Sequence, residues 1–199
     1  MGISASSVKQ LRDKTNAGMM ECKEALQASG GDFDKALDYL RKKGLSAATK
    51  RSSKAAKEGT VASYIHMQGR IGVLVEVNCE TDFVARTDEF QAMARDIAMH
   101  IAAANPTYLK PDDIPEGVME KEKGIYREQA QAEGKPEKIW DRIIEGKLKK
   151  YYEEVCLLKQ KFVKDMDITV ETLVSNMISK TGENIIVRRF ARFQLGVQE

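Results

Sequence analysis

The sequence has few of the features that would place a protein in a membrane or outside the cell. Its three cysteines, Cys22, Cys79 and Cys156, are odd in number, far apart and without metal-ligand spacing. We expect them to be free thiols in a reducing compartment. No apolar run approaches the roughly 20 residues that a membrane span needs, and no basic stretch followed by an apolar one marks a signal peptide. These absences predict a cytoplasmic protein that does not enter a membrane.

A clear excess of one charge sign is also lacking. The 199 residues include 32 basic and 30 acidic side chains, whereas a protein that mainly holds nucleic-acid phosphates usually carries a basic excess. Direct nucleic-acid binding is therefore not expected. Aromatic residues make up only 7%, and nine methionines take over part of their role, so that the hydrophobic share of 42% can still form a core. The length suits one medium domain with a small satellite.

The motifs of phosphate and dinucleotide chemistry are missing as well. There is no GxxxxGKS/T loop and no strand-linked GxGxxG. The two histidines, His66 and His100, have no cysteine or serine partner in a recognised arrangement. We therefore expect no catalytic residue, no cofactor and no resident metal, and a protein that is not an enzyme.

One acidic cluster leaves an alternative open. Acidic side chains favour the positive end of a following helix, but oxygen-rich sets also bind magnesium without a strong sequence signature. A metal-dependent enzyme is thus one rival hypothesis, and it predicts a tightly bound metal in an open pocket. The cluster lies where a strand is expected to lead into a helix and consists of Glu76, Glu80, Asp82, Asp88 and Glu89.

Residues 1–45 are predicted to form a three-helix docking module. Apolar residues recur at helical spacing in three stretches separated by glycines. Ser4 and Asp32 are suited to cap the first and third helices, and Gly44 is suited to end the third. A bundle of this size has little core of its own, so it suits a module that docks on a partner.

The segment 46–59 is predicted to be a linker, in part helical, because it is rich in Ala, Ser and Lys and has no persistent apolar stripe. Its basic residues support a second rival hypothesis, a protein that binds RNA or the ribosome. That hypothesis predicts a steep salt dependence of binding to bare RNA. The basic residues concerned are Lys50, Arg51, Lys54 and Lys57, together with Arg188, Arg189 and Arg192.

The remaining residues, 60–199, are predicted to form an α+β core domain with an antiparallel sheet packed by helices. Alternating apolar residues over 71–77 predict the stronger strand of a hairpin. The segment 184–195 predicts a last strand that pairs with this hairpin. Two largely polar helices on either side of Gly134-Lys135-Pro136 predict a projecting helical hairpin over about residues 116–158.

The segment from Asn78 to Arg86 stands out, because it follows the strongest strand pattern and leads into the strongest helix pattern. A corner of this kind presents side chains on a rigid base. Phe83 is large and apolar, and Asp82 beside it is charged. Two interpretations remain open: Phe83 staples the helix to the sheet as part of the core, or its ring faces outward as a probe for a partner.

Two long motifs carry a resemblance to a known family. Thr81-Asp82-Phe83-Val84-Ala85-Arg86 resembles one signature of the elongation factor Ts family, the nucleotide-exchange factors of elongation factor Tu, and the segment 11–26 resembles the other. The chain departs from the family pattern at Asn16, where glycine is common, and at Arg86, where lysine is common. Further likeness extends over nearly the whole chain, in the family's order, through residues 75–79, 98–103 and 134–136.

The resemblance implies a translation elongation factor that binds elongation factor Tu carrying GDP and promotes GDP release by disturbing the Mg²⁺ and phosphate site. The exchange motif would be Thr81, Asp82, Phe83 and Val84, and His66 at the tip of the hairpin would also face the partner. The N-terminal module is UBA-like in this family and would dock on the nucleotide-binding domain. Its implied contact residues are Lys9, Arg12, Met19, Met20 and Lys23.

Two finer expectations concern the module and the assembly. The spacing of Met19 and Met20 predicts that one faces the bundle core and the other faces outward. Long members of the family carry two core halves, whereas this chain carries one. The resemblance therefore implies a possible homodimer.

Overall fold

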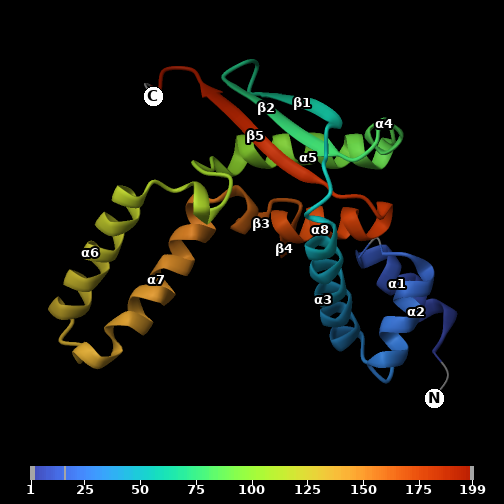
Figure 1. Cartoon of the computed structure of the whole chain (residues 1–199), viewed down its shortest axis with the longest axis horizontal. Coiled ribbons are helices and arrows are strands. Elements are labelled where there is room, and N and C mark those ends of the chain that lie inside the picture. The colour runs from blue at the N-terminus through green and yellow to red at the C-terminus, as the bar shows by residue number, and fades with distance from the viewer. Residues whose placement is uncertain (1–2, 16, 198–199) are drawn as a thin grey trace.

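The computed structural model describes residues 3–15 and 17–197, so Asn16 lies outside the described residues. Three parts are visible in Figure 1: a helical module at the N-terminus, a core in which helices pack under a sheet, and a long helical hairpin that projects from the core. The combination of an antiparallel three-stranded sheet with packed helices confirms the predicted α+β class.

The N-terminal module consists of α1 (Ala5–Thr15), α2 (Met19–Ala28) and the first part of α3 (Phe33–Arg51). The predicted caps are present, since Ser7 N–H donates to Ser4 Oγ at 3.0 Å and Lys35 N–H donates to Asp32 Oδ1 at 3.0 Å. A small separate core holds the three helices together. It is made of Val8, Leu11, Cys22, Ala25, Leu26, Ala36 and Leu40.

The expectation that α3 ends at Gly44 is wrong. The helix continues to Arg51, so the first part of the predicted linker 46–59 is helical and only the remainder leads as a loop into the sheet. Gly44 instead faces α8 (Val170–Thr181), where a Cβ built on it would make ordinary contacts of 3.5 Å with Ser179 Oγ and 3.6 Å with Asn176 Oδ1. A small residue in a helix that packs against another helix does not need to end it.

The sheet has the order β1-β2-β5 and is antiparallel throughout, with β1 (Glu58–His66), β2 (Ile71–Cys79) and β5 (Ile186–Gln194). The predicted pairing of the last strand with the early hairpin is thereby confirmed. One face carries Val73, Val75 and Val77, which are fully buried in the main core. The other face is not covered by any described part of the chain and exposes several large apolar side chains, which are Val61, Ile65, Leu74 and Phe193.

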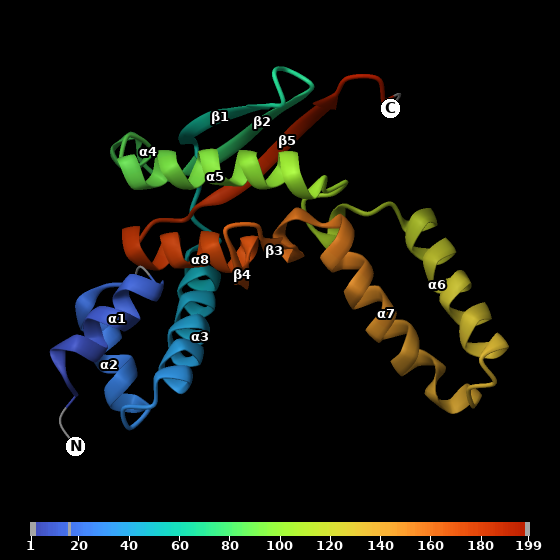
Figure 2. The same cartoon turned by 180° about the vertical axis from the view of Figure 1, so that it is seen from behind.

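The main core lies between the sheet and two helices. α5 (Asp88–Ala104) runs beneath the sheet, and α8 lies further below it (Figures 1 and 2). A short hairpin of β3 (Lys161–Phe162) and β4 (Asp165–Thr169) precedes α8. The apolar side of α5 is fully buried against the sheet, as its helical spacing predicts. That side consists of Phe90, Met93, Ala94, Ile97, Ala98 and Ile101.

The projecting helical hairpin is formed by α6 (Glu116–Ala132) and α7 (Trp140–Val155). Ile144 and Leu148 of α7 are buried in the seam together with Ala130 of α6. Ile139 lies outside this seam, because it belongs to the 3₁₀ turn before α7 and is 37% exposed. The turn after Pro136 delays the start of the helix, so Ile139 does not share the inward face.

A histidine fixes the junction between the core and the chain that returns from this hairpin. The buried His100 ring accepts a hydrogen bond from Val163 N–H at Nδ1 (3.3 Å), and its Nε2 lies 3.0 Å from Gln160 Oε1. Gln160 in turn donates to the carbonyl of Glu154 at 2.7 Å. Burial lowers the pKa of His100, which favours the neutral ring. None of the described helices is long and apolar enough to cross a membrane.

Candidate functional site

The corner between β2 and α5 holds the Thr81–Arg86 motif. β2 ends at Cys79, and the short helix α4 (Asp82–Ala85) begins three residues later. Thr81 has an extended backbone and caps α4, because its hydroxyl accepts a hydrogen bond from Val84 N–H at 3.3 Å. A second threonine, Thr87, caps α5 in the same way through Phe90 N–H at 3.3 Å. Two capped helices in succession hold the corner in one conformation.

The motif is divided between an inward and an outward side. Val84 is only 7% exposed and belongs with Ala85 to the main core, whereas Phe83 is 77% exposed. The interpretation that Phe83 staples the helix to the sheet is therefore wrong. A single helical turn presents successive residues about 100° apart, so it cannot bury all of its apolar side chains on one flat core. Val84 and Ala85 hold the turn, and the ring of Phe83 points away from it.

Asp82, beside this ring, is also exposed. Its carboxylate lies 3.0 Å from Arg86 Nη2, four residues further along the chain. Both side chains are largely in solvent, so an ion pair of this kind adds little to stability. The exposed surface at α4 therefore combines one apolar ring with one carboxylate and the exposed cation of Arg86.

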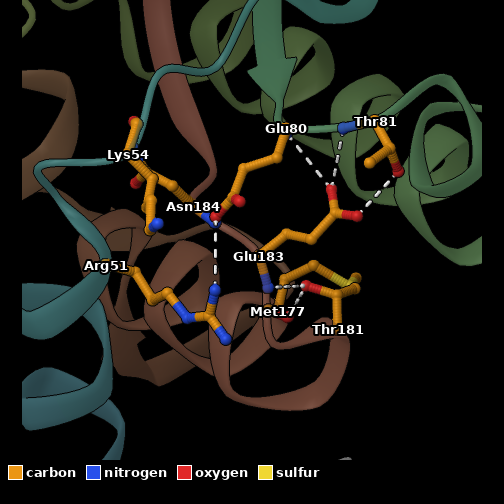
Figure 3. A network of polar contacts seen from close by, with 8 residues as sticks. All are labelled: Arg51, Lys54, Glu80, Thr81, Met177, Thr181, Glu183 and Asn184. Atoms are coloured by element: carbon orange, nitrogen blue, oxygen red, sulfur yellow. Dashed lines mark hydrogen bonds and ion pairs between the residues drawn. The ribbon is translucent and has the colours of Figure 1, made fainter.

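A second carboxylate lies directly under the motif (Figure 3). Glu183 Oε2 accepts hydrogen bonds from Glu80 N–H and Thr81 N–H, each at 3.1 Å. Glu183 Oε1 accepts a hydrogen bond of 2.7 Å from the Thr81 hydroxyl. The residues are about a hundred positions apart in the chain, so no local sequence pattern indicates this contact. It is the contact at the site that sequence reasoning missed.

Cys79 packs beneath the same corner. Its thiol is fully buried and lies 3.1 Å from the Thr81 carbonyl oxygen. Burial, with the nearby charge of Glu183, raises the pKa of Cys79 to about 11. The thiol is therefore protonated at neutral pH and is not an activated nucleophile. Its contribution is to packing and to the hydrogen bond with the backbone of the motif.

The acidic cluster that suggested a magnesium site is distributed over separate contacts. Glu76 pairs with Arg189 at 2.7 Å, and Glu89 pairs with Lys180 at 2.7 Å. Glu80 accepts from Asn184 N–H at 2.7 Å and lies 3.7 Å from Arg51. Among the residues that the structure describes, no group of three or more His, Cys, Asp or Glu side chains is arranged to hold a metal ion.

The predicted docking residues lie on the surface of α1 and α2. Lys9, Arg12 and Lys23 are exposed. Met19 is 46% and Met20 75% exposed, so the expectation that one of them faces the bundle core is wrong. Position 18 is the cap of α2, and both methionines lie in its first turn, while the buried face begins only with Cys22. Two adjacent exposed methionines form an adaptable apolar surface.

His66 ends β1 beside the turn of the hairpin and is exposed. Its ring stacks on Tyr64 at a centroid distance of 5.8 Å, and the Tyr64 hydroxyl lies 3.2 Å from His66 Nδ1. The motif follows the opposite end of β2, so at about 3.4 Å per residue the two lie roughly 25 Å apart. The structure therefore does not bring His66 to the Thr81–Arg86 motif. Figure 1 shows α4 and the N-terminal module at the same end of the long axis.

Several basic residues of the RNA-binding hypothesis have local partners. Arg189 pairs with Glu76, and Arg51 lies close to Glu80. Arg192 donates to the Ala102 carbonyl at 3.3 Å. These contacts provide a structural use for the cations within the protein itself.

Comparison with known proteins gives a consistent result. The family model described as Elongation factor TS matches residues 6–197. The chain is 74% identical to an Elongation factor Ts of Syntrophus aciditrophicus over 196 residues, which cover 98% of each chain. It is 58% identical to an Elongation factor Ts of Geobacter sulfurreducens, with 98% of this chain and 91% of that protein covered. A relative of the same name from Thermodesulfovibrio yellowstonii is 56% identical, with 98% of each chain covered.

Proposed function

Because the chain belongs to the elongation factor Ts family, we propose that it is a translation elongation factor that binds elongation factor Tu carrying GDP and promotes release of the nucleotide. The observation that carries the proposal is the exposed ring of Phe83 on a capped and buried helical turn. An apolar ring held in solvent on a rigid base loses little conformational entropy when it enters a pocket.

In this mechanism Phe83 enters the partner near its Mg²⁺ and phosphate site, and Asp82 supports the displacement. A bound cation is the largest local positive charge in such a site, so its displacement leaves the phosphates of GDP without their main neutraliser. Val84 acts from below as the anchor of the turn, because it is buried. Thr81 holds the first turn of α4 through its cap.

The N-terminal module supplies the docking contact in this proposal. Lys9, Arg12 and Lys23 offer positive charge, and Met19 and Met20 offer apolar area. The module and α4 lie at the same end of the molecule, so one partner domain can contact both (Figures 1 and 2). His66 lies at the other end of the sheet and is proposed to contact a different part of the partner.

Linkage limits what such a factor can do. Any weakening of nucleotide affinity by the factor equals the weakening of the factor's own affinity by nucleotide. A thousandfold coupling corresponds to about 4 kcal/mol. The factor therefore accelerates exchange in both directions, and the concentrations of GTP and GDP decide which nucleotide is rebound.

Stopped-flow release of a fluorescent GDP analogue from elongation factor Tu tests the proposal. Phe83→Ala is expected to slow release, and Asp82→Ala combined with it to slow release further, with the fold intact because both side chains are exposed. Met166→Ala is a matched control, since it removes an apolar side chain that is 62% exposed on β4. Unchanged release with Phe83→Ala would remove the ring from the mechanism.

We further propose that the protein acts as a homodimer through the uncovered face of its sheet. Val61 and Ile65 of β1 are 64% and 65% exposed, and Leu74 of β2 and Phe193 of β5 are 49% and 61% exposed. These four side chains share one face, because Val61, Ile65 and Leu74 alternate with residues of the buried face and Phe193 pairs with Gly72. Two such faces can pack against each other as a β-sandwich about 10 Å thick.

Size-exclusion chromatography with light scattering, which gives the molar mass of the protein as it elutes, tests this assembly. Leu74→Arg is expected to convert a dimer to a monomer, because a charge at the centre of an apolar interface is costly to bury. Ile139→Arg is the control, since Ile139 is an exposed apolar residue at the tip of the helical hairpin, away from the sheet. A wild-type protein that elutes as a monomer over the micromolar range would rule out the dimer.

A further inference from the structure

The Glu183 carboxylate makes three hydrogen bonds to the two residues that precede α4, and the mechanism above does not use it. We infer that Glu183 is a positioning residue of the exchange reaction, which sets the orientation of Phe83 through the Thr81 hydroxyl. The inference rests on the proposed function of Phe83. It concerns a residue of the core that approaches the motif from the far end of the chain.

The motif needs such support because α4 is too short to hold itself. A helix of four residues has at most one or two internal hydrogen bonds to offset the ordering of its backbone. Its first N–H groups have no partner within the helix and depend on a cap. Thr81 provides that cap to Val84 N–H at 3.3 Å. The first turn of α4 therefore depends on the orientation of this hydroxyl group as well as on the burial of Val84 and Ala85.

Glu183 determines this orientation. A threonine hydroxyl has a single hydrogen and two lone pairs. Since its hydrogen is donated to Glu183 Oε1 at 2.7 Å, the lone pairs are left for Val84 N–H. A hydrogen bond to a carboxylate is shorter and stronger than one between neutral groups. The other carboxylate oxygen fixes the backbone N–H groups of Glu80 and Thr81, each at 3.1 Å, so both ends of the Thr81 residue are held.

Glu183 is itself held in place by the end of α8. Gly182 ends this helix in the left-handed conformation (φ 71°), which turns the chain toward β2. Glu183 N–H then donates to Thr181 Oγ1 at 3.3 Å, and the next residue, Asn184, donates its N–H to Glu80 at 2.7 Å. The carboxylate under the motif is thus preorganised by its own neighbours, as a supporting contact of a functional site must be.

The same contacts reach the segment that follows the docking module. The Asn184 side chain donates to the Lys54 carbonyl at 2.7 Å, and Glu80 lies 3.7 Å from Arg51, the last residue of α3 (Figure 3). The base of the motif is therefore connected to the end of the helix that begins in the docking module.

The test compares Glu183→Ala with Phe83→Ala in GDP release, measured over a range of factor concentrations. Glu183→Ala is expected to lower the maximal release rate by about tenfold to a hundredfold, the loss typical of a misplaced group, while the concentration at half-maximal rate changes less than about twofold because the docking surface is intact. Glu183→Gln keeps an oxygen acceptor for the two backbone N–H groups but places an NH2 donor against the Thr81 hydroxyl, so its rate is expected to lie between those of Glu183→Ala and the wild type.

Two further readouts separate positioning from general stability. Amide hydrogen exchange of residues 80–84 in the free protein is expected to accelerate in Glu183→Ala, while exchange in the three-stranded sheet stays unchanged. Glu171→Ala is the matched control, because it removes an α8 carboxylate that pairs with Lys159 at 2.8 Å and lies outside the network under the motif. Glu171→Ala is expected to leave both the release rate and these amides as they are.

The outcomes are distinguishable. If the Phe83→Ala variant promotes GDP release as fast as the wild type does, the proposed function fails. Amide hydrogen exchange still reports in that case whether Glu183 holds the motif. If Phe83→Ala is slow and Glu183→Ala is as fast as the wild type, the inference is overturned. Equal slowing by Glu183→Ala and Glu171→Ala, in step with their melting temperatures, would also overturn it, since the effect would then be one of stability.

Discussion

Replacement of Gly59 by alanine is expected to destabilise the sheet strongly. Gly59 lies in β1 opposite Asn78 and has a φ of +146°, a backbone conformation that residues with a side chain rarely adopt. A Cβ placed there would lie 2.1 Å from the Val77 carbonyl oxygen and 2.7 Å from Asn78 Cα. Both neighbours are backbone atoms of the central strand, so no side chain can rotate away to make room.

The magnitude follows from two contributions. A residue in a sparsely populated backbone conformation costs about 1–3 kcal/mol, and an extra methyl group in a packed interior costs about 1–3 kcal/mol. Gly59→Ala is therefore expected to lower the free energy of unfolding by about 2–6 kcal/mol. For a chain of this size the melting temperature falls by about 2–4 °C per kcal/mol, so a decrease of about 4–24 °C is expected.

Thermal unfolding followed by circular dichroism checks this expectation, with Gly72→Ala as the control in the same pair of strands. A Cβ on Gly72 would meet only Ile65 Cδ1, at 3.5 Å, which is an ordinary contact. The control is therefore expected to melt within about 2 °C of the wild type, as surface changes usually do. A melting temperature for Gly59→Ala within that same range would refute the steric argument.

Three further experiments test the helix contact at Gly44, the pH dependence due to His100 and the burial of the cysteines. Gly44→Ala is expected to raise the free energy of unfolding by up to about 1 kcal/mol in a urea titration, because alanine is the better helix former and its methyl group would make contacts of 3.5 Å or more; a loss of stability would contradict this reading. Burial lowers the pKa of His100 below 6.5, so its contribution to the free energy of unfolding is complete above about pH 6.5 and decreases as the pH falls below that value. His100→Gln is expected to make the free energy of unfolding from urea titrations depend less on pH between pH 7 and pH 5. The same pH dependence in the variant and the wild type would contradict this expectation. Cys22, Cys79 and Cys156 are buried, and burial raises the pKa of the last two to about 11, so a thiol reagent at pH 7.5 is expected to label none of them in the native protein and all of them in urea; rapid native labelling would disprove their burial.

Periodic patterns predicted most elements of the fold, because each element buries one side against a continuous core. The alternation in β2 and the helical stripe of α5 both match their buried faces. The end of α3 was not predictable from Gly44, since the same glycine signal marks a helix end or a close helix–helix contact. Only the position of α8 in space distinguishes the two, and no local pattern contains it.

The candidate site shows the same division. The motif itself is legible in the sequence, because Thr81 to Arg86 stand together at a corner. The direction in which Phe83 points could not be predicted from the sequence, since apolar residues at such corners are usually part of the core. In the structure it is Val84, not Phe83, that packs in the core. Glu183 could not be found either, because it reaches the motif through tertiary structure.

The helical hairpin enters and leaves the core at neighbouring points. Tyr108, before α6, forms an isolated parallel bridge with Cys156, after α7, and its carbonyl accepts a hydrogen bond from Leu157 N–H at 2.8 Å. The chain between Tyr108 and Cys156 therefore leaves the core and returns to it at the same place. Its length is therefore independent of the rest of the architecture: a pair of helical turns inserted or removed at its far end would change the reach of the arm by about 5 Å per turn and leave the sheet, α5 and the corner with Phe83 where they are.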